Sequence, residues 1–323
     1  MEEQLSAKII SNVNKVIVGK DKQVELLTVA LLVGGHVLLE DVPGTGKTKM
    51  ARSLAKSLDL TFKRVQFTID LLPSDLTGIN YFDRGADKFV FREGPVFTNI
   101  LLADEINRAT ARTQSSLLEC MEEKQVTVDG QTYPLAAPFL VIATQNPIES
   151  QGTFPLPEAQ LDRFLMMLTM EYPTRDQSIE ICKRFAVSDP LETLGSIMSG
   201  PDLLQMQKKA SEVKVSDLLY GYAADIVEAT RNNSKIRVGA SPRALLAYVA
   251  AAKALAFVRG RDFVTPDDFK ELAVPVLSHR LSMVSSGAFS ADGSVMTGRE
   301  SSVSVVKEIL DSVTCPTEDI SGR

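Results

Sequence analysis

The sequence predicts an α/β protein with a five-stranded parallel sheet, followed by an all-helical region. Three observations lead to this fold class. Five short apolar runs, of the kind that form strands buried on both faces, alternate with segments of helical spacing. A glycine-rich loop joins the first strand to a helix, and beyond the fifth apolar run the chain has helical segments only.

The elements follow one another in a regular order. A helix over residues 21–33 ends at Gly34 and Gly35, and a second helix over residues 47–58 follows the glycine-rich loop. The five expected strands cover residues 36–40, 62–67, 99–105, 139–144 and 164–170.

Two insertions interrupt the alternation. Residues 124–135 alternate around Asp129 and Gly130, a pair that favours a type I′ turn, so we expect a β-hairpin before the fourth strand. Residues 71–97 are rich in turn signals and aromatic residues, which predicts a second, projecting insertion.

We place a domain boundary near Pro190, with an α/β core over residues 1–189 and a helical domain over residues 190–323. Thr174 and Ser216 are candidate helix caps, and Ser241 and Thr265 each combine a cap with proline at the first helical position. The apolar run 244–258 contains Lys253 and is too short for a membrane span, so it predicts a buried helix.

The composition makes some functions and cell compartments less favoured than others. A net charge of -6 argues against a nucleic-acid-binding surface. The three cysteines are scattered and the two histidines are isolated, so we expect structural roles for them and a reducing compartment. The first residues lack a secretory pattern, and cytoplasmic localisation is the expectation.

The loop after the first strand matches a phosphate-binding pattern except at its first position, where Asp41 replaces glycine. Backbone N–H groups would hold the phosphates, Lys47 would reach the β and γ oxygens, and Thr48 would bind Mg²⁺. Asp41 tolerates a turn but is an unusual neighbour for a triphosphate, so we predict a perturbed but competent loop. The expected nucleotide-binding residues here are Asp41, Val42, Pro43, Gly44, Thr45, Gly46, Lys47 and Thr48.

Polar residues end the next strands. Asp104 and Glu105 follow an apolar strand, at the sheet edge where the loop lies; Asp104 would bind the Mg²⁺ shell and Glu105 would polarise water. The alternative is a solvent-exposed acidic pair. Asn146 is suited to orient the water or the γ-phosphate, or it is only a turn residue before Pro147.

Two arginines are candidates for binding phosphate charge. Arg163 would stabilise the transferring phosphate, or it would simply pair with Asp162 or a neighbouring carboxylate. Arg243 lies in the first turn of a capped helix, where the helix dipole also attracts an anion.

Together the stretches PGTGKT, LLADEINRA, ATQNPIESQGTFPLPEAQLDRF and GASPRALL resemble the MoxR family of AAA+ ATPases, across almost the whole chain. The resemblance implies a P-loop AAA+ nucleotide domain with β-hairpin insertions and an all-α lid. It implies that Asn146 is sensor 1, that Arg163 is an arginine finger for a neighbour's site and that Arg243 is sensor 2. Val18 and Gly19 would line the adenine.

The family resemblance also implies a function. The expected protein hydrolyses ATP with Mg²⁺ in a hexameric ring and remodels partner proteins, often with von Willebrand A domains, to assist maturation or metal insertion. Alternatives are a nucleotide-binding scaffold without hydrolysis, a nucleic-acid motor and a subunit similar to magnesium chelatase. No nucleic-acid partner and no membrane insertion are expected.

Overall fold

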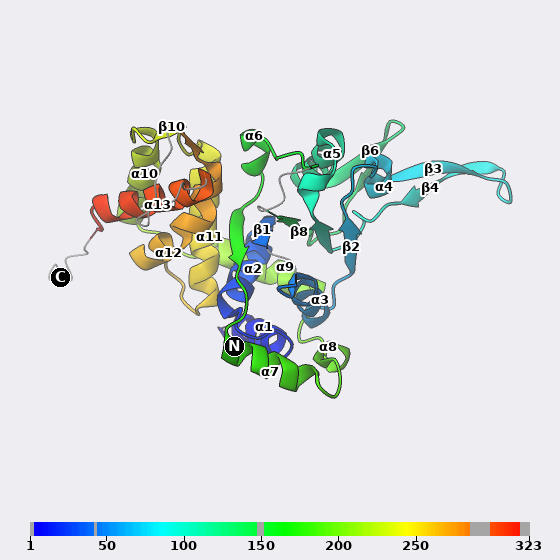
Figure 1. The fold of residues 1–323 in the computed structure, drawn as a ribbon, viewed down its shortest axis with the longest axis horizontal. Coiled ribbons are helices and arrows are strands. Elements are labelled where there is room, and N and C mark those ends of the chain that lie inside the picture. The colour runs from blue at the N-terminus through cyan, green and yellow to red at the C-terminus, as the bar shows by residue number, and fades with distance from the viewer. Residues whose placement is uncertain (1–2, 42–43, 147–151, 285–297, 317–323) are drawn as a thin grey trace.

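A computed structural model describes residues 3–41, 44–146, 152–284 and 298–316, without the side chains of residues 3–6, 41 and 298. Its centre is a five-stranded parallel sheet with the strand order β2-β5-β8-β1-β9 (Figure 1). The strands are β1 (Val37–Asp41), β2 (Phe62–Gln66), β5 (Ile100–Asp104), β8 (Leu140–Gln145) and β9 (Met166–Met170). The predicted fold class and the positions of the five predicted strands are confirmed. The expectation that all five are buried on both faces is wrong for β2, because this strand lies at the edge of the sheet and is largely exposed.

Both faces of β5, β8, β1 and β9 are covered, which explains their nearly continuous apolar sequences. In β1, Val37 and Leu39 belong to the hydrophobic core that packs on α1, α2 and α3, whereas Leu38 belongs to the core under α5. These helices are α1 (Glu3–Asn14), α2 (Asp21–Val33), α3 (Lys47–Ser57) and α5 (Ala111–Glu123). In β5, β8 and β1 the polar groups are therefore concentrated at the strand ends, where a parallel sheet binds ligands, whereas the edge strand β2 also carries Lys63 and Arg64.

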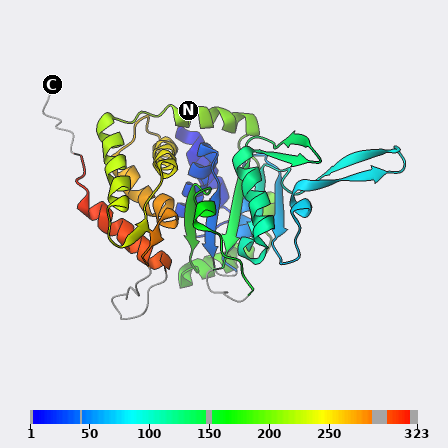
Figure 2. The ribbon, with the colours of Figure 1, turned by 90° about the horizontal axis from the view of Figure 1, so that it is seen from above.

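The two predicted insertions are β-hairpins. The turn between β6 and β7 passes through Asp129 and Gly130 with φ values of 50° and 80°, as a type I′ turn requires. The hairpin of β3 and β4 projects from the body of the molecule (Figures 1 and 2). The segments are α4 (Pro73–Thr77), β3 (Gly78–Asp83), β4 (Lys88–Glu93), β6 (Gln125–Val128) and β7 (Gln131–Pro134).

After β9 the described chain is helical, apart from a short antiparallel pair of strands, β10 and β11. Thr174, Ser216 and Ser241 cap helices as predicted, because each side chain accepts a backbone N–H from the first turn. The elements after β9 are α7 (Arg175–Phe185), α8 (Pro190–Thr193), α9 (Gly200–Ser211), α10 (Asp217–Arg231), β10 (Ile236–Val238), α11 (Pro242–Val258), α12 (Pro266–Leu277), the 3-10 turn η2 (Ser278–Arg280), β11 (Ser282–Met283) and α13 (Gly298–Ser312). The short helix α6 (Glu158–Leu161) and the 3-10 turn η1 (Ile106–Arg108) precede β9.

The helical region places α10, α11, α12 and α13 at the β9 end of the sheet, opposite the projecting hairpin (Figure 2). Its central helix, α11, packs on α2 and α12, and the fully buried Tyr248 donates its hydroxyl to the carbonyl of Phe269. Within the described residues, no helix is long and apolar enough to cross a membrane. The boundary near Pro190 stays a prediction.

Candidate active site

The backbone between β1 and α3 is shaped to receive an anion. Gly44 and Gly46 have φ values of 88° and 91°, a left-handed conformation that other residues rarely adopt. Apart from the adjacent residues, no described atom lies within 4 Å of the Cβ that either glycine lacks, so the backbone conformation favours glycine here. Gly46 precedes the first helical residues, Lys47 and Thr48, and the helix N-terminus offers N–H groups and partial positive charge.

Part of the predicted loop lies outside the described residues, namely Val42 and Pro43. Asp41 is described through its backbone only, which pairs with Met170 of β9. The influence of the Asp41 carboxylate on nucleotide affinity therefore stays a prediction.

Asp104 ends β5 beside Lys47, and its carboxylate is surrounded by donors. Oδ1 lies 3.1 Å from Lys47 Nζ and accepts a hydrogen bond from Thr144 Oγ1 at 2.7 Å. Oδ2 accepts from Arg64 through Nε at 3.1 Å and Nη2 at 2.6 Å. The structure thus joins the predicted lysine and aspartate through direct contact.

These donors determine the charge of Asp104. Burial by itself raises the pKa of this carboxyl, but the hydrogen bonds from Thr144 and Arg64 and the charge of Lys47 outweigh it, and the pKa is lowered. The side chain is therefore ionised at neutral pH.

The donor set fits Mg²⁺. The Asp104 carboxylate and the Thr48 hydroxyl are hard oxygen ligands, the kind that Mg²⁺ prefers. In the described part of the chain, no group of three or more His, Cys, Asp or Glu residues forms a metal site. These oxygens thus fit an ion that nucleotide phosphates and water also hold, as is usual for Mg²⁺.

Glu105 turns the chain out of β5. Its φ of 57° is left-handed, a strained conformation for a residue with a side chain. Its N–H donates to Thr144 Oγ1 at 2.8 Å, its carboxylate accepts from Gln66 Nε2 at 2.7 Å, and it pairs with Arg108 Nε at 3.1 Å. The carboxylate is thereby held at the sheet edge, where it can orient a water molecule.

Asn146 directly follows β8, which lies between β5 and β1. It therefore lies on the carboxyl edge between the strand that carries Asp104 and the strand that leads into the loop.

The segment expected to line adenine lies beside the end of β9. Gly19 has a φ of 66°, and an added Cβ would lie 2.2 Å from the Gln177 side chain, so α7 packs directly on this segment. Lys20, next to Gly19 and Val18, is buried and donates to the carbonyl of Glu171 at 2.6 Å. The segment is thus fixed at the same edge of the sheet as the phosphate loop.

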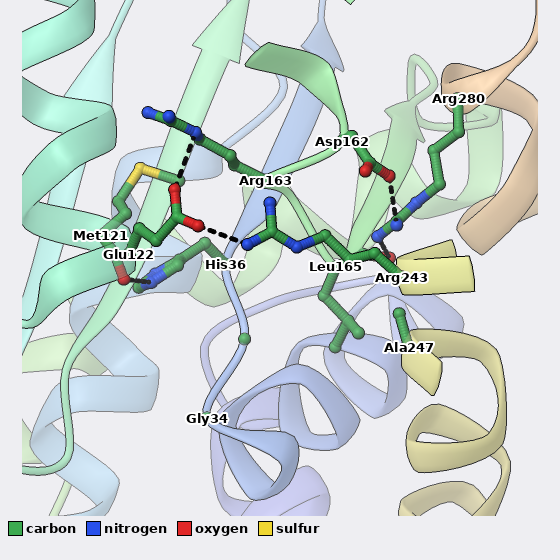
Figure 3. Close-up of a pocket in the computed structure, with 11 residues that line it drawn as sticks. Gly34, His36, Met121, Glu122, Asp162, Arg163, Leu165, Arg243, Ala247 and Arg280 are labelled. Atoms are coloured by element: carbon green, nitrogen blue, oxygen red, sulfur yellow. Dashed lines mark hydrogen bonds and ion pairs between the residues drawn. The ribbon is translucent and has the colours of Figure 1, made fainter. Parts of the chain in front are cut away.

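The two predicted arginines meet at a different place, on Glu122 near the end of α5 (Figure 3). Arg163 Nε lies 3.0 Å from Glu122 Oε2, and Arg243 Nη2 forms an ion pair with Oε1. The hydrogen bond from Arg243, partly offset by desolvation, lowers the pKa of the Glu122 carboxyl. Of the two alternatives for Arg163, pairing with a neighbouring carboxylate is observed in this single chain.

Asp162 binds another arginine, Arg280, which is 3% exposed in its side chain. Arg280 Nη1 donates to Asp162 Oδ1 at 2.6 Å and Nη2 donates to the carbonyl of Phe164 at 2.7 Å. Arg280, Asp162, Glu122 and the two predicted arginines line a cavity of about 230 Å³ (Figure 3). Three arginines against two carboxylates make this cavity attractive to an anion.

The phosphate-loop residues and the arginine cavity lie at opposite ends of the strands. His36, at the amino end of β1, lines the arginine cavity, whereas the phosphate loop follows the carboxyl end of the same strand. Five residues of β1 separate them, or about 17 Å at a strand's usual rise. The structure therefore does not bring Arg163 or Arg243 to the phosphate loop of their own chain.

Several residues of the site were not predicted from the sequence: Arg64, Gln66, Glu122, Thr144 and Arg299, which pairs with Glu40 of β1. Gln66 is the last residue of β2 and Thr144 the penultimate residue of β8, the strands on either side of β5, and polar residues near strand ends were a usable signal. Glu122 and Arg299 are charged residues of helices, and nothing in their local sequence separates them from ordinary surface charges.

A parallel sheet of this order, with a phosphate loop after β1, paired acids after β5 and a helical lid, defines an AAA+ ATPase. The comparisons agree: residues 36–166 match the model of the ATPase family associated with various cellular activities (AAA), and residues 228–302 match the AAA lid domain.

The similarity to known proteins covers almost the whole chain. The uncharacterized protein YeaC of Bacillus subtilis is 45% identical over 99% of this chain and 97% of its own, and the chaperone MoxR1 of Mycobacterium tuberculosis is 46% identical over 85% and 74%. A crystal structure of a protein from Cytophaga hutchinsonii has a TM-score of 0.88 and 40% identity, and covers 98% of this chain and 96% of its own. The chain belongs to the MoxR family of AAA+ ATPases.

Proposed function

We propose that this protein binds and hydrolyses Mg²⁺-ATP in a ring of identical subunits, and that Arg163 and Arg243 act on the nucleotide of the neighbouring subunit. The position of these arginines carries the proposal, because they lie at the edge of the sheet opposite their own phosphate loop. A head-to-tail contact between copies would join the two edges and form closed rings. A hexamer is the proposed assembly.

Each residue at the carboxyl edge has a proposed role. Lys47 and the loop N–H groups hold the phosphates, and Thr48 and Asp104 hold Mg²⁺, which neutralises phosphate charge when bound. Glu105 orients the attacking water, and Asn146 positions it or the γ-phosphate. The segment with Val18 and Gly19 lines the adenine.

Mixing two inactive variants tests this proposal. Lys47→Ala removes the phosphate contact but keeps the arginines, and Arg163→Ala or Arg243→Ala does the reverse. In randomly mixed rings about a quarter of the interfaces join an intact loop to an intact arginine, so about a quarter of native turnover should return. Arg237→Ala is the matched control, because this exposed arginine contacts Glu158 of α6 and Ser282 of β11 among the described residues and does not line the arginine cavity.

No recovery on mixing would refute the action in trans. Unchanged turnover in Glu105→Gln would refute the role of Glu105, and tight ATP binding without hydrolysis at any protein concentration would favour a scaffold.

We further propose that ATP turnover remodels partner proteins, including proteins with von Willebrand A domains, and thereby assists maturation or metal insertion. Support comes from the name of the relative MoxR1, a chaperone. Glu105→Gln with ATP should capture partners that Lys47→Ala does not. If both variants capture the same proteins, the proposal of an ATP-dependent client fails.

A further inference from the structure

Arg299, at the start of the lid helix α13, reaches the carboxyl edge of the sheet. Its guanidinium forms an ion pair with Glu40 of β1, and its Nη2 donates to Thr169 Oγ1 of β9 at 2.9 Å. The rest of α13 packs on α10 and α12 within the helical region. One side chain therefore links the lid to two strands of the nucleotide-binding sheet.

Glu40 is the centre of a polar row across three strands. In the sheet register it lies beside Gln145 of β8 and Thr169 of β9. Gln145 Nε2 donates to Glu40 Oε1 at 3.2 Å. The residue after Glu40 begins the phosphate loop, and the residue after Gln145 is Asn146. The row therefore lies one residue before the predicted nucleotide-binding residues on β1 and β8.

The charges make this contact sensitive to nucleotide. The Glu40 side chain is only 13% exposed, and a carboxylate with so little water needs a cation. Burial lowers the pKa of Arg299 to about 10, so the guanidinium is still charged at neutral pH. If α13 moved away, Glu40 would face a triphosphate without its counter-charge, and the repulsion would weaken binding.

We propose that Arg299 is a positioning residue that couples nucleotide binding to the seating of α13 on the sheet, and that it acts through Glu40. Because such coupling is reciprocal, nucleotide must also stabilise the seated helix. The inference rests on the ATP binding proposed above.

Four variants of the full chain test the coupling: Arg299→Gln, Arg299→Lys, Glu40→Gln and the double variant with both glutamines. The dissociation constant of Mg²⁺-ATP is measured for each. Arg299→Gln should weaken binding roughly tenfold, the effect of one uncompensated charge near the phosphates. The lysine variant and the double variant should recover most of the affinity, because a cation returns in one and the repelling carboxylate is gone in the other.

Amide exchange of residues 298–312 supplies a readout that a purely stabilising ion pair would not move. ATP should protect these amides in the native chain but not in Arg299→Gln. Lys235→Gln is the matched control, because it removes the cation of another ion pair to α13, an exposed one with Glu308 at 2.7 Å. It should leave the affinity unchanged.

Two results would overturn the inference. If Arg299→Gln lowers only thermal stability, the pair is structural; if the double variant binds as weakly as Arg299→Gln, the arginine does not act through Glu40. A native chain that binds no ATP would instead refute the proposed function on which the inference rests.

Discussion

Replacing Thr144 by valine removes the hydroxyl that joins the two acids after β5. The side chain is 1% exposed, and valine has nearly the same shape, so no cavity is created. The hydroxyl donates to Asp104 Oδ1 at 2.7 Å and accepts the Glu105 N–H at 2.8 Å. The variant therefore isolates two hydrogen bonds.

The magnitude follows from these partners. Losing a hydrogen bond to a charged group costs about 1.5–3 kcal/mol, and leaving a buried N–H without an acceptor costs about 1–3 kcal/mol. Lys47 and Arg64 still pair with Asp104, so the lower half of each range applies. We expect Thr144→Val to lower the free energy of unfolding by about 3 kcal/mol and to slow ATP turnover.

The loss of unfolding free energy in Thr144→Val should depend on pH. A carboxyl whose pKa is lowered in the folded state contributes stability above its unfolded pKa, and this contribution disappears as the pH falls through the folded pKa. Because the Thr144 bond helps to lower the pKa of Asp104, the difference between native chain and variant should be largest at neutral pH and shrink in acid.

Urea unfolding of the native chain, Thr144→Val and Thr144→Ser measures the effect. Serine keeps the hydroxyl and loses only a methyl group, so it should remain within about 1 kcal/mol of the native chain. Equal unfolding free energies for the serine and valine variants would show that the hydroxyl contributes nothing, and the reasoning would be refuted.

Three further predictions concern the loop, the arginine cavity and the histidines. Gly46→Ala forces a side chain into a conformation that costs about 1–2 kcal/mol, and ATP affinity should fall about tenfold in a titration; unchanged affinity would contradict the backbone argument. Arg280→Ala should lower the free energy of unfolding by about 3 kcal/mol because it leaves Asp162 without its cation, although Ser241 Oγ still donates to this carboxylate, and adding Asp162→Ala should restore part of it. Burial lowers the pKa of His36 to about 4 and of His279 to about 3, so NMR titration should find both imidazoles neutral at pH 5. The free energy of unfolding should fall as the pH drops below about 6.5, because the imidazoles of the unfolded chain then take up protons. A histidine of the folded protein that titrates near pH 6 would contradict this.

Local patterns were enough to predict most of the fold. Strands buried on both faces have continuous apolar sequences, and the Asp129–Gly130 turn depends on the two residues that adopt it. Helix caps such as Ser241 are equally local, because the hydroxyl bonds to a backbone N–H three residues away. The site residues at the strand ends were predictable for a related reason: parallel strands bring their carboxyl ends to one edge.

The sequence by itself thus determined the succession of strands and helices along the chain, the glycines of the phosphate loop and the two acids at the end of β5, since each depends on neighbours along the chain. Only the tertiary structure decided where distant charges meet. Glu122 binds two arginines that follow it by 41 and 121 residues, and Arg299 of the lid binds Glu40 of the sheet. A long charged side chain has many partners of opposite sign, and only the packing of the lid on the sheet selects among them.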